Sequence, residues 1–309
     1  MTSAPLVPGP VTVRVPAKVN LELLVGPLRD DGYHALSTVY QAVSLYDDLT
    51  VSAADEWGVS VIGPLAASVP VGEDNIAMRA ARLLRRHYDG DPVHISIHKG
   101  IPVAGGMAGG SADAAAALVA LDHLWELGLS REEIEQVAAE LGSDVPFLVA
   151  GGTAMGSGRG ELLAPVLARG TYHWVLALSD GGLSTPEVYA ECDRLRGDIE
   201  VPEPVANPAL MAALRTGDPH ELAPQLANDL QEAAVSLRPA LGEVLESGME
   251  YGALGAVVSG SGPTVAFLVE DNEAGIDLAV ALTASGSVRD VRRATGPVHG
   301  AHVIPGRID

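Results

Sequence analysis

The chain has 309 residues, of which 47% are hydrophobic, and its 40 acidic and 19 basic residues give a formal net charge of −21. This length is enough for two domains, and the negative charge argues against a nucleic-acid partner, which an acidic surface would repel. A single cysteine, no signal-peptide pattern and no apolar run long enough for a membrane span predict a cytoplasmic protein without internal disulfides or a membrane partner.

The first half of the chain is predicted to mix short strands with helices. Apolar alternation indicates strands at 11–15, 19–25, 41–45, 49–52, 59–62 and 93–98, with Pro16 separating the first two. An amphipathic helix is expected over 75–88, with His87 on its apolar face, and further helices over 111–127 and 131–141. Ser130 and Glu133 have the spacing of a capping box at the start of the last helix.

A second half is expected to begin between Glu161 and Thr171. Its predicted strands are 173–178, 256–259 and 264–269, and its predicted helices are 186–195, 230–251 and 273–284. A proline-rich connector occupies 198–208. Because no regular strand–helix–strand repeat is visible, we assign the chain to the α+β class, with domains at 1–168 and 169–309.

A glycine-rich loop, IPVAGGMAGGSADAAAAL at 101–118, leads into a helix of small residues, with Ser111 as its expected N-cap. Backbone N–H groups at a helix start, where the macrodipole is positive, bind phosphate, and glycines let the backbone approach it closely. The loop lacks the lysine of a Walker A motif and the glycine spacing of a Rossmann motif. A turn that only caps a core helix is the alternative interpretation.

Three further segments contain candidate catalytic residues. In PAKVN, Lys18 and Asn20 share one face of a strand. Asp144 in GSDVPF is expected between a helix end and an apolar, strand-like run. A second glycine loop, with Ser261, lies within 258–267. Taken singly, such a lysine is typical of a solvated charge, and such an aspartate is typical of a turn.

In combination, these segments resemble the ordered motif set of the GHMP kinase superfamily. PAKVN, the glycine loop, GSDVP and SGSGPT occur in the family's order, and DGYH at 31–34 and EDN at 73–75 strengthen the likeness. The resemblance covers nearly the whole chain, from about residue 11 to about residue 297. It implies an N-terminal domain like ribosomal protein S5 domain 2, a ferredoxin-like C-terminal domain and an active site in the cleft between them.

The resemblance also implies an activity, namely ATP- and Mg²⁺-dependent phosphorylation of the 2-hydroxyl of CDP-methylerythritol on the methylerythritol phosphate route to isoprenoid (terpenoid) precursors. Lys18 and Asp144 would be the catalytic pair, and Asp144 would orient the attacking hydroxyl more than deprotonate it. The residues assigned to ATP are Asn75, Lys99, Pro102, Val103, Ala104, Gly105, Gly106, Met107, Ala108, Gly109, Gly110, Ser111 and Ala112, with Ser111 also assigned to Mg²⁺. Those assigned to the acceptor are Asn20, Tyr33, His34, Thr185 and Tyr189.

The loop differs from the family's common GGLGGGSS at Ala108 and Ala112. A Cβ at Ala108 is acceptable if that residue has a negative φ, and Ala112 leaves Ser111 as the sole hydroxyl candidate. Other GHMP kinases, of the homoserine or mevalonate type, share the loop but would not need DGYH. A non-catalytic ligand-sensing member would keep the fold and lose Lys18 or Asp144. We expect a monomer or a weak homodimer.

Overall fold

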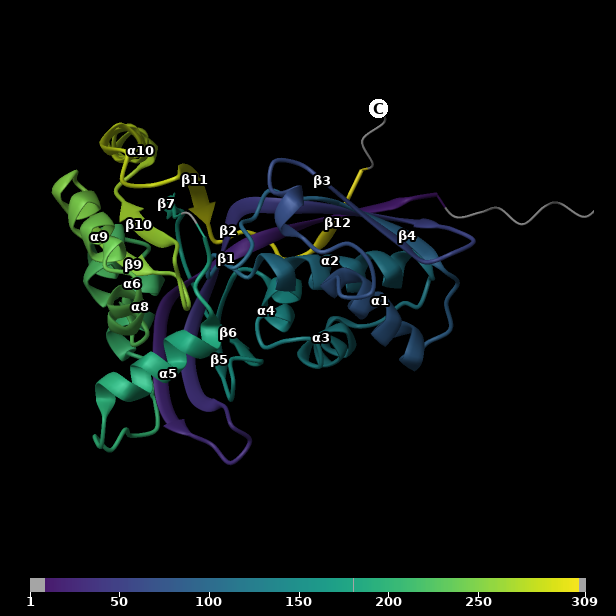
Figure 1. Ribbon diagram of the computed structural model, residues 1–309, viewed down its shortest axis with the longest axis horizontal. Helices are drawn as coiled ribbons and strands as arrows, with labels where there is room; N and C mark the ends of the chain where they lie inside the picture. The colour runs from purple at the N-terminus through teal and green to yellow at the C-terminus, as the bar shows by residue number, and fades with distance from the viewer. Residues whose placement is uncertain (1–8, 180, 306–309) are drawn as a thin grey trace, which may run out of the picture.

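The computed structural model describes residues 9–179 and 181–305, which form two sheets with helices packed on them (Figure 1). The larger, eight-stranded sheet has the order β12-β1-β2-β4-β3; β5 also pairs with β2, β6 with β5, and β8 with β1. Its strands are β1 (Val11–Leu28), β2 (His34–Ala53), β3 (Gly58–Ile62), β4 (Val93–His98), β5 (Thr153–Ser157), β6 (Leu162–Pro165), β8 (Ala227–Asn228) and β12 (His302–Ile304). The mixed arrangement confirms the α+β class.

The helices of the N-terminal half lie on one face of this sheet (Figure 1). They are α1 (Ile76–His87), α2 (Gly109–Leu124), α3 (Arg131–Ala139) and α4 (Val145–Ala150), with a short 3₁₀ turn η1 (Ala66–Ser68) before them. Helix α2 contacts β1, β2, α1, α3 and α4, so it is enclosed on nearly all sides. A helix in that position must be apolar all round, which explains its run of alanines.

The C-terminal sheet is antiparallel with the order β11-β7-β10-β9. It is formed by β7 (Tyr172–Leu178), β9 (Gly255–Val258), β10 (Val265–Val269) and β11 (Asp290–Gly296). Its helical segments are α5 (Thr185–Arg196), α6 (Pro208–Thr216), α7 (Pro219–Leu222), η2 (Ala223–Gln225), α8 (Gln231–Leu237), α9 (Ala240–Glu250) and α10 (Asn272–Ser285). When the four strands are numbered in chain order, their order across the sheet is 4-1-3-2. Helices follow the first and third strands, so the topology is the predicted ferredoxin-like one.

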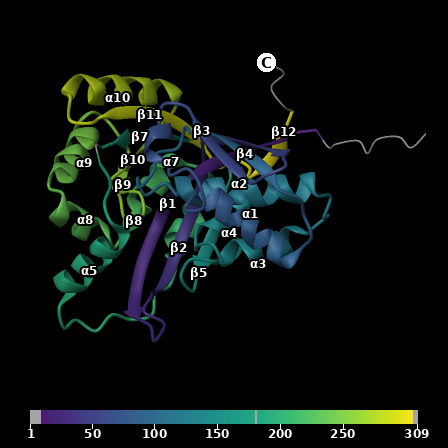
Figure 2. The ribbon, with the colours of Figure 1, turned by 45° about the vertical axis from the view of Figure 1, so that its right-hand side comes forward.

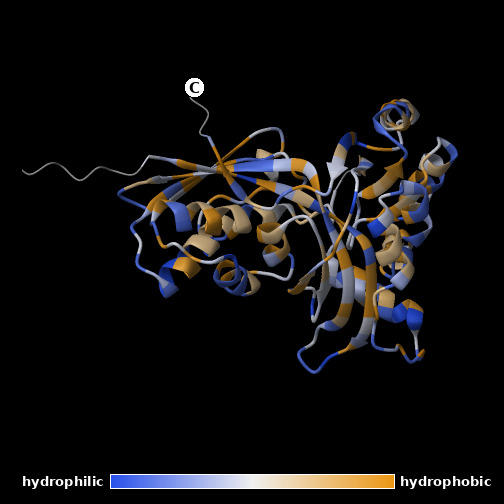
Figure 3. Ribbon diagram, turned by 180° about the vertical axis from the view of Figure 1, so that it is seen from behind, coloured by the Kyte–Doolittle hydropathy of each residue, from blue (hydrophilic) through white to orange (hydrophobic). Residues whose placement is uncertain are grey.

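Strands β1 and β2 form one long hairpin that runs from the N-terminal sheet past α5 of the C-terminal half (Figure 2). The predicted break at Pro16 is wrong, because β1 continues through it with a register shift between Pro16 and Ala17. A bulge tolerates proline since no ladder bond is required from its missing N–H. Apolar residues are spread along these strands and the helices packed on them (Figure 3).

Other predicted elements differ in their details. The run after Asp144 is the helix α4, not a strand, and the predicted 230–251 helix is two helices, because Pro239 disfavours helical geometry at Arg238. His87 is exposed. Strands β5, β6, β8, β11 and β12 and helices α6 and α7 were not predicted. None of the helices within the described ranges is long and apolar enough to cross a membrane.

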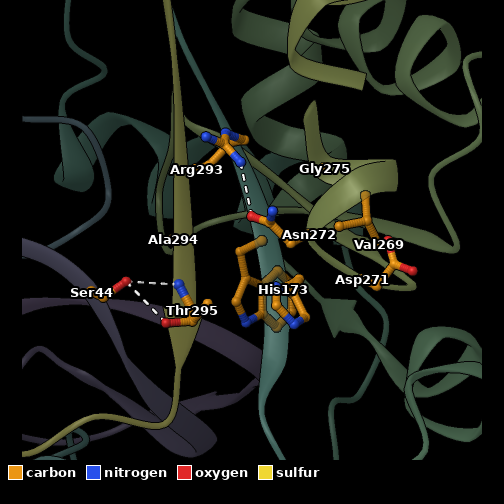
Figure 4. Close-up of a pocket in the computed structure, with 10 residues that line it drawn as sticks. Ser44, His173, Val269, Asp271, Asn272, Gly275, Arg293, Ala294 and Thr295 are labelled. Carbon is orange, nitrogen blue, oxygen red and sulfur yellow. Dashed lines mark hydrogen bonds between the residues drawn. The ribbon is translucent and has the colours of Figure 1, made fainter. Parts of the chain in front are cut away.

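The two halves of the chain are joined by polar contacts between β2 and the C-terminal sheet. Ser44 Oγ accepts a hydrogen bond from the backbone N of Thr295 at 2.8 Å (Figure 4), and Trp174 Nε1 donates to Gln41 Oε1 at 2.9 Å. An adjacent cavity of about 170 Å³ lies beside Arg293, which donates to Asn272. It is smaller than usual ligand sites of about 300–1,000 Å³. The division after residue 168 falls between β6 and β7, but β8 and β12 pair with β1.

Candidate active site

A cavity of about 930 Å³ lies between the two halves of the chain, large enough for two small-molecule substrates. It receives residues from β1, the glycine loop, the start of α4, α5 and the second glycine loop. The predicted site residues that line it are Lys18, Asn20, Tyr33, His34, Ala104, Gly105, Gly106, Ala108, Gly109, Gly110, Ser111, Asp144, Thr185 and Tyr189. The topology therefore brings most of the candidates, from distant parts of the sequence, into one space.

The start of α2 opens into this cavity. The N-cap is Ala108, not Ser111, and Ala108 has φ +60°, the conformation that its Cβ makes costly. No side chain caps the helix, so the first N–H groups lack both an intrahelical partner and a capping oxygen. Ser111 lies in the first turn and lines the cavity. These features suit a bound anion, such as a phosphate.

The two glycine loops pack against each other. Ser259 Oγ donates to Gly106 O at 3.0 Å, and Thr264 N donates to Gly105 O at 3.3 Å. Gly106 has φ +75°, and a Cβ there would lie 1.9 Å from Ser259 O, so only glycine fits. The C-terminal half therefore supports the conformation of the first loop.

Lys18 and Asp144 lie close together in the cavity, beside these two glycine loops. Lys18 Nζ lies 3.9 Å from Asp144 Oδ2 and donates to Asn20 Oδ1 at 2.5 Å. Lys18 is only 3% exposed, and burial lowers its pKa, an effect that the charge of Asp144 opposes. Gly260 makes room for the ammonium group, because a Cβ there would lie 3.0 Å from Nζ.

Tyr40 is a neighbour of Asp144 that sequence reasoning missed. Burial raises the pKa of its hydroxyl well above the ordinary value, and the charge and hydrogen bond of Asp144 raise it further. Tyr40 therefore stays protonated and donates to the carboxylate. Lys18 Nζ lies 5.8 Å from the centre of the same ring. The apolar alternation of the strand segments predicts which residues are buried, but it does not indicate that this tyrosine faces the site.

Aromatic side chains gather in another part of the cavity. The rings of His34 and Tyr189 are stacked with their centres 5.3 Å apart, and His34 Nε2 lies 3.0 Å from Asp193 Oδ1. Tyr33 is more than half exposed. Thr185 and Ser261 join α5 to the second glycine loop through a hydroxyl–hydroxyl contact of 2.8 Å. This part can hold a flat heterocycle, with hydroxyl groups nearby.

The side chains of Lys99 and Asn75 do not line the cavity, so their assignment as nucleotide contacts stays a prediction that the cavity lining does not support. Lys99 is fully buried, and its Nζ donates to Asp47 Oδ2 at 2.6 Å, Asp113 Oδ2 at 2.8 Å and Gly109 O at 2.7 Å. The Asn75 side chain caps α1 and donates to Pro70 O. Both side chains are committed to holding the fold around the loop.

Four residues of the loop are likewise absent from the cavity wall. Met107 and Ala112 are fully buried in the core, and Pro102 and Val103 do not reach the cavity either. Sequence reasoning treated the loop as a uniform phosphate-binding stretch. In the structure 104–106 and 108–111 line the cavity, whereas Met107 and Ala112 are buried in the core and Val103 is exposed.

Lys99→Met is expected to lower the free energy of unfolding by about 3–5 kcal/mol, because it leaves buried carboxylates without their cation. Asp113→Asn is the matched control. Burial, first of all, raises the pKa of Asp113. An amide at this position still offers an oxygen to Lys99 Nζ, so the exchange should cost only about 1 kcal/mol. Urea unfolding of both variants measures the difference, and equal losses would contradict this account of the buried cluster.

The chain matches two family models. Residues 75–152 match the GHMP kinases N terminal domain, and residues 210–288 match the GHMP kinases C terminal model. A crystal structure of 4-(cytidine 5'-diphospho)-2C-methyl-D-erythritol kinase superposes with a TM-score of 0.74 at 33% identity, covering 92% of this chain and 98% of the other. A homoserine kinase from Cytophaga hutchinsonii also gives 0.74 at 18% identity, which shows the common fold alone. The fold and the two matched family models place the chain among the GHMP kinases.

Curated relatives narrow the class. Proteins named 4-diphosphocytidyl-2-C-methyl-D-erythritol kinase are 57% identical in Mycolicibacterium smegmatis, over 96% of this chain and 93% of the relative, and 58% identical in Nocardia farcinica, over 97% and 98%. The relative of that name from Thermobifida fusca is 58% identical over 96% of this chain and 99% of its own. The chain belongs to the family of these 4-diphosphocytidyl-2-C-methyl-D-erythritol kinases within the GHMP kinases.

Proposed function

We propose that the chain transfers the γ-phosphate of ATP to the 2-hydroxyl of 4-diphosphocytidyl-2-C-methyl-D-erythritol, yielding the 2-phosphate and ADP. The observation that carries this proposal is the position of Lys18 and Asp144 in one cavity with the uncapped start of α2 and the aromatic rings. The uncapped start of α2 suits a polyphosphate, and the aromatic rings suit the pyrimidine of the acceptor. The relatives' shared name supplies the acceptor.

Phosphoryl transfer requires positioning and charge stabilisation more than covalent chemistry from the protein. The backbone N–H groups of 105–111 would hold the β- and γ-phosphates. Asp144, held by Tyr40, would orient the 2-hydroxyl so that its oxygen attacks the γ-phosphorus while the bond to the bridging oxygen of ADP breaks, and the carboxylate would take up the hydroxyl proton as the new bond forms. The ammonium of Lys18 would offset the charge that develops on the transferred group.

The donor set also fits Mg²⁺, which usually binds through one or two carboxylates, substrate phosphates and waters. Ser111 lies in the first turn of α2 and lines the cavity. We therefore assign Ser111 as the side chain that would hold the ion, with substrate phosphates and waters as its other ligands. When bound, the ion supplies neutralising charge to the β- and γ-phosphate oxygens.

The same cavity argues against the alternatives. Homoserine and mevalonate are small and have no nucleobase, so the rings of Tyr33, His34 and Tyr189 would have no aromatic ligand to stack on. A ligand-sensing member without activity would not need both Lys18 and Asp144.

We also propose that the enzyme is cytoplasmic and is a monomer or a weak dimer. The single cysteine supports the cytoplasmic location. We place the boundary between the two domains near residue 168.

A coupled assay of ADP release tests the proposed function. We expect kcat/KM for 4-diphosphocytidyl-2-C-methyl-D-erythritol to exceed kcat/KM for homoserine or mevalonate by more than about 10⁴-fold. Only the first acceptor has a pyrimidine that fills the part of the cavity lined by the aromatic rings. Phosphorus NMR of the product identifies the phosphorylated hydroxyl. Preferential use of homoserine or mevalonate would overturn the assignment.

A further inference from the structure

A tight turn between β5 and β6 brings one arginine to the aromatic part of the cavity. Gly158 and Gly160, both with positive φ, flank Arg159, and Leu36 N on β2 donates to Gly158 O at 2.9 Å. A Cβ on Gly160 would lie 2.4 Å from Tyr40 Oη, so the turn packs closely against the tyrosine that holds Asp144. Its position beside the β1–β2 hairpin is therefore well defined (Figure 1).

Arg159 points over the ring of Tyr33. Its guanidinium carbon lies 5.0 Å from the ring centre, and both residues line the cavity. The side chain is 33% exposed, and its ion pair with Glu161 is long, at 3.6 Å between Nε and Oε1. Since a guanidinium has five N–H donors, most of them remain available to a ligand.

The charge of the acceptor makes this arginine informative. Among the cavity-lining residues that the structure describes, Lys18 and Arg159 are the lysine and arginine side chains, while Asp144 and Asp193 are acidic. Lys18 is buried at the reacting end beside Asp144. A diphosphate between the pyrimidine and the reacting hydroxyl would need another cation in a protein with a net charge of −21.

We propose that Arg159 binds the diphosphate of the acceptor, while its contact with the Tyr33 ring fixes the direction of the guanidinium. This inference rests on the proposed function. A guanidinium matches phosphate oxygens with two parallel hydrogen bonds, and it stacks on aromatic faces, which an ammonium does less well. The turn thus selects acceptors that carry a nucleoside diphosphate.

Calorimetry with CDP and with cytidine tests the role of Arg159 without turnover. The wild-type chain is expected to bind CDP more tightly than cytidine. Arg159→Ala should weaken CDP binding about 10- to 100-fold, the usual cost of a charged hydrogen bond, and leave cytidine binding within about threefold. Arg159→Lys should recover part of the loss. In turnover, the KM of the acceptor should rise while kcat and the KM of ATP stay within about twofold of wild type.

Arg29→Ala is the matched control. Arg29 lies on the β1–β2 hairpin, is paired with Asp31 at 3.1 Å and is absent from the cavity wall, so its loss removes the same charge without the contact. Unchanged CDP binding in Arg159→Ala, or an equal loss in Arg29→Ala, would overturn the diphosphate assignment. A wild-type chain that binds CDP but phosphorylates no CDP-linked acceptor would instead overturn the proposed function, on which the assignment rests.

Discussion

Asp144→Asn is expected to lower kcat by about 10²- to 10⁴-fold, the usual contribution of a carboxylate that orients or accepts a proton in the transition state. The amide keeps the size of the side chain but loses the charge that pairs with Lys18 at 3.9 Å. The KM of ATP should change little, because the backbone of 105–111 holds the phosphates. Steady-state kinetics with varied ATP and acceptor separate the two effects.

The fold should survive this substitution. Asp144 precedes α4 without donating a capping oxygen to it, its side chain is 30% exposed, and the amide oxygen of asparagine can still accept from Tyr40. Asp55→Asn, which removes the same charge from an exposed turn after β2, is the control and should keep wild-type turnover. Wild-type kcat in Asp144→Asn would remove the proposed catalytic pair.

Local patterns in the sequence were sufficient for the parts of the fold that local chemistry determines. The alternation at 93–98, the capping box at Ser130 and the apolar run at 173–178 correspond to β4, α3 and β7. The glycine loop and Asp144 could be singled out because a glycine-rich helix start is itself a phosphate-binding feature. The family resemblance then linked segments that no spacing rule could connect.

Long-range contacts could not be predicted. Whether Gly106 has room for a Cβ depends on Ser259, which is 153 residues away, and the continuity of β1 through Pro16 depends on its register with β2. Ala108 shows the same limit, because its positive φ follows from the packing of the loop, against the preference of its own Cβ. Tertiary structure overrides local preference at these positions.

The two lysines of the chain show how little residue type alone determines. Both are buried, yet Lys99 has two carboxylates and a carbonyl around its ammonium, whereas Lys18 has one distant carboxylate and an amide. The first is neutralised within the protein and supports the start of α2 through Gly109 O. The second keeps a partly unbalanced charge at the cavity, where a phosphate can complete its coordination.

Lys18→Met is expected to lower kcat by about 10²- to 10³-fold, comparable to losing one group that stabilises transition-state charge. Stability should not fall with activity. Burial lowers the pKa of Lys18 below its ordinary value of 10.5, so its charged form costs folding free energy at neutral pH, and methionine fills similar volume without that cost. The penalty disappears once the pH exceeds 10.5, where the lysine is neutral in both states. We therefore expect a Tm at pH 7 equal to or above that of the wild type.

The pH profile supplies a check that unfolding could not mimic. Because the ammonium form is the active one and its pKa is lowered, kcat/KM of the wild type should fall on the alkaline side at a pH below 10.5. The residual activity of Lys18→Met should lack this alkaline limb, since the titrating group is gone. A limb that persists in the variant would show that another group titrates, and a large drop in Tm would show that Lys18 supports the fold instead of the transition state.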